Sequence, residues 1–246
     1  MKKRALLGLL LLGGCPKSDV PRGPASLLAE ARRALAEREK RLTSFSVVVD
    51  STEAGQRAHH EFAFRSPNKS RGHLTSPQDV ELAFDGATFV RLLHAEKKFE
   101  VVSLAPSPAD RAFFLASAFM PFVPEGYRAP LLPQSGVEAK SVSRPNATDA
   151  VELTVQPGDG VTVVYVLRLP AGDFLEKRTR SSGTEERVLR VEAERCDEKL
   201  RLCVPTRLVE KQGEATLGTT EVSSVELNPA LPQDFFSPKA PAGWTK

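Results

Sequence analysis

The chain has 246 residues, of which 41% are hydrophobic and 26% are charged, and its formal net charge is +3. This composition excludes a disordered or collagen-like chain and leaves room for one large β domain or two small ones. Lys2, Lys3 and Arg4 account for the whole positive excess. Because no basic patch with interleaved aromatic residues remains elsewhere, we expect no nucleic-acid partner.

The N-terminus has the pattern of an export signal. Three basic residues precede the apolar run Ala5–Leu12, and the small residues Gly13 and Gly14 follow it. The run is too short to span a bilayer, which takes roughly 20 residues. We therefore expect residues 1–14 to be removed as a signal peptide.

The sequence around Cys15 resembles the bacterial lipobox, in which a leucine and two small residues precede a cysteine that is lipidated before cleavage. The resemblance implies that a lipidated Cys15 anchors the mature protein to a membrane. A lipobox cysteine carries two or three acyl chains, which bind a membrane stably, whereas one chain binds only marginally. Residues 15–24 would form the lipidated N-terminus and a flexible tether. Pro16 stands where an aspartate would signal inner-membrane retention, so we expect the outer membrane and a domain facing the periplasm. The alternative is an ordinary secretory signal with a chance cysteine.

The mature chain is predicted to begin with one helix and to continue in strands. Apolar residues recur at helical spacing over Ser26–Leu42, with Ser26 as the predicted N-cap. After Leu42 the period changes to two, which is typical of half-buried strands. Asp85-Gly86 predicts a tight hairpin. These first strands lie near residues 45–50, 61–65, 80–84, 89–93 and 99–104.

Residues 108–133 break the strand pattern. Most residues of 112–120 are apolar and have helical character, and closely spaced prolines follow. A helix that is apolar on most of its circumference must bury both sides. It could do so in a core or as a lid over an apolar cavity, and the sequence leaves both open.

The second half returns to strands joined by short turns. They lie near residues 151–155, 161–169, 187–195, 204–211 and 216–227. Without helices between them, successive strands favour an antiparallel sheet. We predict an α+β protein, mostly antiparallel β, with about ten to eleven strands in one domain over residues 25–246.

Two further cysteines lie between predicted strands. Cys196 and Cys203 are separated by six residues, and export permits a disulfide. We expect a disulfide that joins the two strands of a hairpin. A redox or metal-binding pair is the alternative, but the spacing is not C-x-x-C and no histidine lies nearby in the sequence.

No motif indicates catalysis or a bound metal. His59 and His60 are adjacent and would point to opposite faces of a strand, while His73 and His94 are scattered. Nucleotide-binding, zinc-protease and hydrolase-nucleophile motifs do not occur. We therefore expect no enzyme activity, no metal site and no cofactor.

Several short segments resemble the family of the periplasmic lipoprotein carrier LolA and its outer-membrane receptor LolB. A predicted helix ends in Leu42–Ser46, a strand reads Phe62–Asn68, and a turn lies at Asp85-Gly86. The C-terminal segments Asn228–Phe236 and Pro241–Trp244 resemble the pattern with which the sequences of this family end. These matches spread over most of the mature chain, which favours a shared architecture.

This resemblance implies an incomplete, half-open antiparallel barrel with an N-terminal helix and a helical lid segment. Its concave apolar face would receive the acyl chains of lipoproteins. The alternative is that the same side chains fill a closed core. The predicted lining residues are Phe62, Phe64, Leu82, Phe84 and Phe89, and the predicted lid residues are Phe113, Phe114, Phe119 and Met120.

One departure from the family concerns the lid. In the carrier, an arginine directly before the strand-ending proline helps to hold the lid. Here Ser66 precedes Pro67, and Arg65 lies one residue earlier. A one-residue offset turns a strand side chain to the opposite face, so we do not expect this arginine to hold the lid.

The sequence therefore predicts a lipid-anchored, non-enzymatic binding protein of the outer membrane, with lipoprotein acyl chains or another lipid as ligand. An envelope-stress sensor or a scaffold with a periplasmic protein partner would use the same fold and is the alternative. A hydrolase is the least favoured hypothesis, because no catalytic arrangement supports it.

Overall fold

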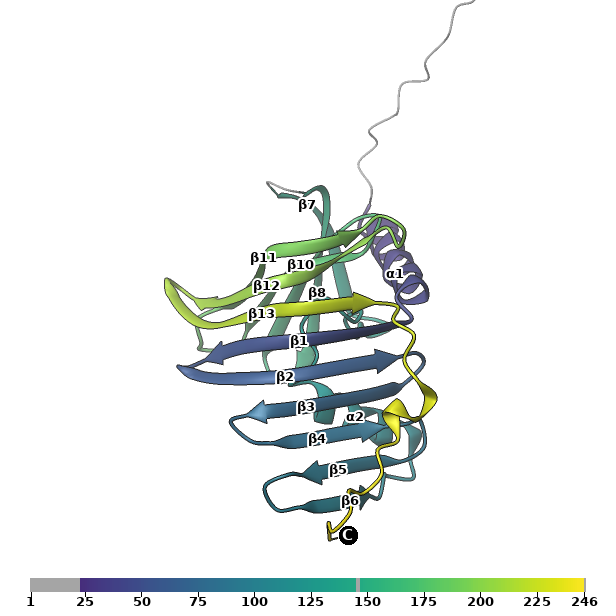
Figure 1. The fold of residues 1–246 in the computed structure, drawn as a ribbon. Helices are drawn as coiled ribbons and strands as arrows, with labels where there is room; N and C mark the ends of the chain where they lie inside the picture. The colour runs from purple at the N-terminus through teal and green to yellow at the C-terminus, as the bar shows by residue number, and fades with distance from the viewer. Residues whose placement is uncertain (1–22, 145–146, 246) are drawn as a thin grey trace, which may run out of the picture.

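The computed structural model describes residues 23–144 and 147–245, so Cys15 and the lipobox lie outside the described residues. The described chain forms one antiparallel 13-stranded sheet in the order β6-β5-β4-β3-β2-β1-β13-β12-β11-β10-β9-β8-β7 (Figure 1). The strands are β1 (Ser44–Glu53), β2 (Gln56–Arg65), β3 (Lys69–Ser76), β4 (Val80–Phe84), β5 (Phe89–Leu93), β6 (Lys98–Val102), β7 (Val137–Arg144), β8 (Ala147–Gly158), β9 (Val161–Arg168), β10 (Asp173–Arg180), β11 (Arg187–Asp197), β12 (Leu202–Gln212) and β13 (Ala215–Leu227).

Two meanders build the sheet. β1–β6 and β7–β13 each run through consecutive hairpins, and the first and last strands of the domain, β1 and β13, join them. β6 and β7 are the two edges and do not pair with each other, so the sheet stays open. The α+β, half-open antiparallel architecture predicted from the sequence is therefore confirmed.

The structure has more strands than the ten to eleven that the sequence predicts. The strands that were missed are β3, β7 and β10, whose sequences KSRGHLTS, VEAKSVSR and DFLEKRTR contain few apolar residues. Strand prediction relies on alternation of apolar and polar residues. These three segments are strands because they complete the hydrogen bonding of their neighbours.

The N-terminal helix α1 (Pro24–Arg41) starts two residues before the predicted boundary, with Gly23 rather than Ser26 at the N-cap. Pro24 is favourable there, since the first turn of a helix needs no amide hydrogen from it. The buried side of the helix packs against β7 and β8. Its apolar residues Leu27, Ala31, Ala34 and Leu35 share a cluster with Val151, Leu153, Leu167 and Phe174 of the sheet.

A second cluster covers the concave face of the first meander. It includes side chains from β1, β2, β4, β5 and the segment after β6. The opposite, outer face of β4–β6 carries a smaller cluster, against which Trp244 and Ala240 of the C-terminal segment pack. None of the described helices is long and apolar enough to cross a bilayer.

Candidate functional site: a covered apolar face

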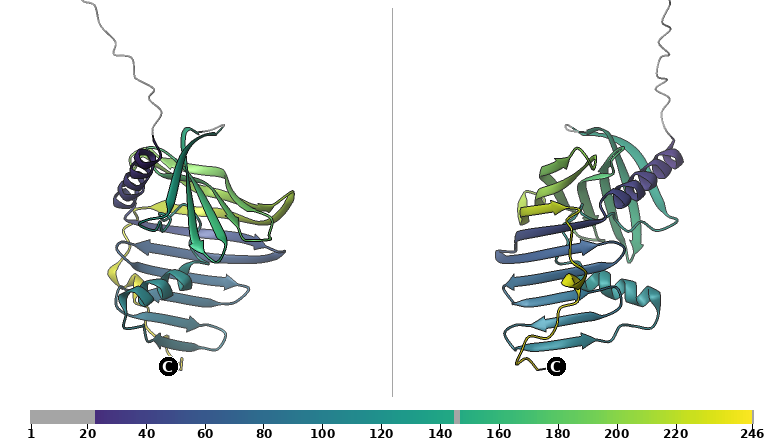
Figure 2. Two further views of the ribbon diagram at one scale, coloured as in Figure 1. Left: turned by 180° about the vertical axis from the view of Figure 1, so that it is seen from behind. Right: turned by 45° about the vertical axis from the view of Figure 1, so that its right-hand side comes forward.

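The concave face of the first meander is covered by residues 108–127, here called the cover segment. It consists of α2 (Pro108–Phe119) and the loop that follows. Ser107 begins the helix by accepting a hydrogen bond from the backbone amide of Asp110 at 3.4 Å. The helix lies against the face of the sheet on the side away from the viewer in Figure 1, and Figure 2 shows it from behind.

The predicted lining residues lie together under this segment. Phe62, Phe64, Phe84 and Phe89 are buried, at most 4% exposed, and Leu82 packs against them with part of its surface free. They share one face because β-strand side chains alternate. The register brings Phe84 directly opposite Phe89.

The predicted lid residues divide between two environments. Phe119 is buried, and its ring centroid lies 6.0 Å from that of Phe62 and 5.8 Å from that of Phe89. Phe114 is 37% exposed and touches Phe89 edge-on. Phe113 and Met120 are 77% and 73% exposed, so the prediction that they cover the cavity is wrong. Only one side of α2 can face the sheet.

Three aromatic residues of the site were not predicted. Phe45 and Tyr127 are buried, with ring centroids 5.2 Å apart. Phe122 lies flat over Gly72 of β3, where a Cβ atom would come within 2.7 Å of the Phe122 ring. The absence of a side chain at Gly72 therefore leaves space for the Phe122 ring of the cover segment. This contact could not be predicted, because the sequence of β3 does not have the pattern of a strand.

His60 provides a polar attachment of the loop. Its Nε2 lies 3.2 Å from the carbonyl oxygen of Phe122, and the two rings meet edge-on. Burial lowers the pKa of His60, and the bond to the carbonyl only partly opposes this. The neutral ring with its proton on Nε2 then donates to the carbonyl.

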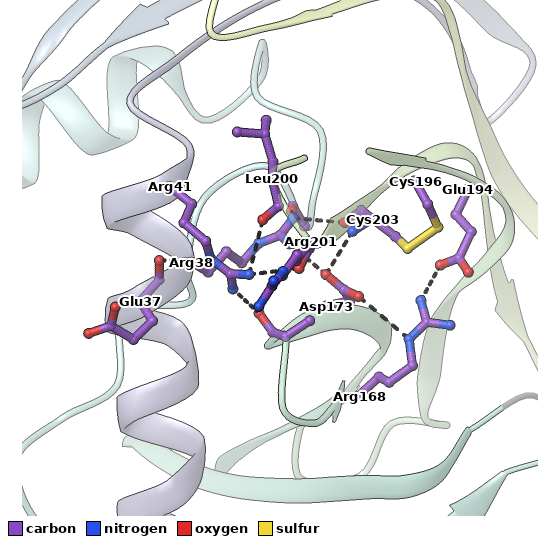
Figure 3. A network of polar contacts seen from close by, with 12 residues as sticks. Glu37, Arg38, Arg41, Arg168, Asp173, Glu194, Cys196, Leu200, Arg201 and Cys203 are labelled. Atoms are coloured by element: carbon purple, nitrogen blue, oxygen red, sulfur yellow. Dashed lines mark hydrogen bonds and ion pairs between the residues drawn. A yellow bond between two sulfur atoms is a disulfide. The ribbon is translucent and has the colours of Figure 1, made fainter. Parts of the chain in front are cut away.

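The far end of the loop is fixed by a buried network around Arg38 of α1 (Figure 3). Arg38 donates to Asp173 of β10 at 2.7 Å, to the carbonyl of Gly126 at 2.7 Å and to the carbonyl of Cys203 at 2.9 Å. Asp173 in turn accepts from the amide of Cys203 at 2.9 Å. One ion pair thus joins α1, the cover segment and the second meander.

Gly126 and Tyr127 strengthen this attachment. Gly126 has a φ of +87°, and a Cβ there would meet Phe174 at 2.8 Å and Pro205 at 2.9 Å. The Tyr127 hydroxyl donates to the carbonyl of Pro205 at 2.9 Å. Burial raises the pKa of this hydroxyl, so it stays protonated as a donor. The chain therefore has to pass tightly against β10 and β12 at this point.

Cys196 and Cys203 are joined by a disulfide beside this network, with 4.0 Å between their Cα atoms. They face each other across the hairpin of β11 and β12. The neighbouring turn carbonyls of Leu200 and Arg201 accept hydrogen bonds from Arg41 of α1 (Figure 3). The cysteine pair and the helix therefore hold the same turn.

Arg65 does not contact the cover segment. Its guanidinium donates to the carbonyl of Leu231 at 2.9 Å and lies over the Phe236 ring, on the C-terminal segment. This agrees with the face expected from its one-residue offset. Arg128 instead lies over the ring of Phe64, with 4.0 Å from its central carbon to the ring centroid.

The helix of the cover segment is held differently from its loop. Among the described residues, no hydrogen bond or ion pair joins α2 to a strand; Leu115, Ala118 and Phe119 contact the sheet only through apolar atoms. A cavity of about 220 Å³ remains beside the loop; apolar Val49 and Leu208 line it together with the acidic residues Glu53, Glu125 and Glu210. This is below the roughly 300–1,000 Å³ of typical ligand sites. A long ligand would need α2 to move.

Comparison with known proteins supports the architecture alone. No family model matches the chain, and no curated protein matches it in sequence. A DUF1329 family protein from Desulfovibrio piger has a similar structure, with a TM-score of 0.54 and 11% identity, over 85% of this chain and 96% of that one. A protein domain from Vibrio parahaemolyticus, described as a candidate for outer membrane lipoprotein sorting, has a TM-score of 0.52 and 11% identity, over 84% and 97% of the two chains.

A LolA superfamily protein from Nitrosomonas europaea is more distant in shape, with a TM-score of 0.48 and 13% identity over 84% of this chain and 96% of that one. The first two structures match almost their whole length to this chain. The chain therefore shares the fold of these two proteins, in agreement with the open antiparallel half-barrel that the resemblance in its sequence predicted.

Proposed function

We propose that this protein is a non-enzymatic binding protein of the bacterial envelope that accepts lipoprotein acyl chains on the concave face of its half-barrel. Lipidated Cys15 would tether it to the outer membrane, with residues 15–24 as the spacer. The LolA-like fold supports a binding role of this kind, although related folds can host different tasks.

One observation carries the proposal: a continuous aromatic face is covered by a helix that only apolar contacts hold. A 16-carbon chain in water costs on the order of 12 kcal/mol, at about 0.8 kcal/mol per methylene. Burial of a phenylalanine side chain contributes about 1.5–3 kcal/mol. An acyl chain could therefore replace the contacts of Phe119 and its neighbours with a net gain, and α2 breaks no polar bond to the sheet when it moves.

The charge of the face is consistent with an uncharged ligand tail. The charged groups described beside the cluster have partners: Arg128, over the Phe64 ring, pairs with Glu39, and Arg91 pairs with Glu100. A tail would therefore meet these charges already paired. The carboxyl or peptide end of such a ligand would remain near solvent.

Lipid binding can be tested with residues 16–246 exported behind a generic signal. Native mass spectrometry should find co-purified lipid or acylpeptide, and a fluorescent fatty acid should bind saturably. Leu82→Glu places a charge on the partly exposed lining and should weaken binding at least about tenfold, the equivalent of 1.4 kcal/mol. Val101→Glu, at a side chain that is 63% exposed on β6, is the matched control.

Two results would reject the proposal. One is a folded protein that binds neither acylpeptide nor fatty acid. The other is equal binding by Leu82→Glu and the wild type. If lipid is absent and one envelope protein is captured by the wild type but lost with Leu82→Glu, the scaffold or stress-sensor alternative replaces lipid binding.

A further inference from the structure

Two histidines that are distant in the sequence meet on the outer face of the first meander, on the other side of the sheet from the cover segment. His73 lies in β3, and His94 directly follows β5. The backbone amide of His94 bonds to the carbonyl of Asp79 at 3.1 Å, which places Asp79 between them. The ligand atoms of these three residues all lie within 4.8 Å of one another.

The side chains of this cluster already contact one another. Nε2 of His73 lies 2.7 Å from a carboxylate oxygen of Asp79. The two imidazoles stack, with ring centroids 5.0 Å apart and planes inclined by 25°. Glu81 of β4 stands next to the pair, with one oxygen 3.7 Å from Nε2 of His94. Two nitrogen and two carboxylate ligands are therefore available.

Nε2 of His94 has an unusual environment. It is shielded from solvent and has no hydrogen-bond partner among the described residues. Buried polar atoms normally have one, so such an atom requires an explanation. The 3.7 Å to Glu81 is too long for a hydrogen bond. A cation placed between the two histidines would provide the missing partner.

The surrounding charges favour a cation as well. Asp79 and Glu81 bring two carboxylates; among the described residues the one arginine paired with them is Arg71, at 2.8 Å from Glu81. With both imidazoles neutral, the cluster has one uncompensated negative charge. Arg71 also fixes the orientation of Glu81, as outer partners of metal ligands commonly do.

We propose that His73, Asp79 and His94 form a binding site for a divalent transition-metal ion of the Zn²⁺ type, with Glu81 as a fourth ligand or as the partner of a bound water. Two imidazoles and a carboxylate are ligands that Zn²⁺, Ni²⁺ and Cu²⁺ prefer, whereas Ca²⁺ and Mg²⁺ prefer sites made only of oxygen. Small rotations of the side chains would bring the ligand atoms to bonding distance. The ion would replace the His73–Asp79 hydrogen bond and would connect β3, β4 and β5.

The C-terminal segment closes one side of this site. Trp244 meets the His94 ring edge-on, with centroids 5.1 Å apart. The backbone of Thr245 bonds to both Lys97 and Phe99 beside β6. An ion that fixes the His94 ring would therefore also fasten the C-terminal segment to the sheet.

The fluorescence of Trp244 can report metal binding at this site, since Trp244 is the only tryptophan of the chain. The full chain, purified in detergent with a tag that lacks histidine and treated with a chelator, is titrated with Ni²⁺ while tryptophan fluorescence is recorded. Nickel held by His94 should quench the emission saturably with one equivalent, and EDTA should restore it. Calorimetry with Zn²⁺ alone should show the same stoichiometry.

His73→Ala, His94→Ala and Asp79→Asn test the ligands. Each should weaken Zn²⁺ binding in calorimetry at least about tenfold, within the range for changes at metal sites. His59→Ala is the matched control, because His59 also pairs with a carboxylate, Asp50 at 2.8 Å. It should bind like the wild type. Asp79 is half exposed, so its variant is expected to fold even if a histidine variant does not.

Three results would overturn the site. One is the absence of saturable quenching together with the absence of Zn²⁺ heat. Another is unchanged Zn²⁺ affinity in folded Asp79→Asn and His94→Ala. The third is an equal loss of affinity in His59→Ala, which would mean that the ion binds to histidines in general.

Discussion

Both helices of this protein pack on the sheet through apolar side chains, but only α1 adds polar bonds to it among the described residues. α1 is attached to the second meander by a buried ion pair and by several hydrogen bonds to backbone carbonyls. α2 lies on the first meander through apolar side chains. Polar bonds inside a protein demand a particular geometry, whereas apolar contacts can be exchanged for others. From this difference we expect α2, rather than the loop of the cover segment, to be the part that can move.

We expect the largest loss of stability when the buried contacts of Arg38 between α1 and the second meander are removed. Arg38→Ala leaves buried Asp173 with the longer ion pair to Arg168, at 3.5 Å, and the amide of Cys203; removal of one member of a buried pair costs about 3–5 kcal/mol, and the lower end of that range is expected. Chemical denaturation of the soluble chain would measure the loss. Lys40→Ala breaks the exposed pair with Glu37 on the same helix and should cost far less, because solvent screens exposed charges. Equal losses in the two variants would contradict a special role of the buried pair.

The disulfide of the second meander should have the next largest effect. It closes a loop between positions seven residues apart, for which loop entropy predicts a loss of about 2–3 kcal/mol on removal. The double variant Cys196→Ser with Cys203→Ser should lower the denaturation midpoint accordingly. Intact wild-type protein should be two hydrogens lighter than its reduced form by mass spectrometry. An unchanged mass on reduction would show that the bond is absent.

The cover can be disturbed without a change to its own residues. Gly72→Ala places a methyl group against the Phe122 ring and should cost about 1–3 kcal/mol as overpacking. If the displaced ring loosens the cover, a fatty-acid probe should enter faster in stopped-flow measurements. Gly23→Ala has free space around its new methyl and serves as the control. Slower or unchanged entry would contradict a movable cover over this face.

The smallest effect concerns pH. The pKa of His60 is lowered in the folded state by burial, so at acidic pH the unfolded chain binds a proton that the folded chain resists. The contribution of His60 to stability should be complete above its ordinary pKa of about 6.5 and should decline as pH falls toward its lowered value. Unfolding at several pH values should therefore show a steeper acid loss in the wild type than in His60→Gln. Parallel curves would exclude His60 as a source of this dependence.

Much of the fold follows from local patterns. Alternation around Phe62 and Phe64 and around Val151 and Leu153 places strands correctly, because a half-buried strand needs one apolar face whatever its partner. Polar strands such as β3 carry no such pattern. β3 forms because its neighbours β2 and β4 have backbone groups that require a strand between them.

The candidate sites divide in the same way. The aromatic lining was predictable because each residue alternates on a strand with a clear pattern. The His73 and His94 cluster was not, since the two residues are 21 positions apart and meet only after β3, β4 and β5 pair. Arg38 has the sequence context of an ordinary surface arginine, and only the approach of β10 and the cover loop buries it.

The sequence by itself determined the antiparallel class, most of the strand positions and the four buried lining phenylalanines Phe62, Phe64, Phe84 and Phe89, and it indicated Cys196 and Cys203 as a candidate pair. The tertiary structure decided how many strands the sheet has, which side of α2 faces it, and which polar groups from separate strands meet. The reason is physical. The apolar periodicity of a helix or strand can be read from its own residues. The partners of a polar group come from segments that are far away in the chain, so they are known only once the chain has folded.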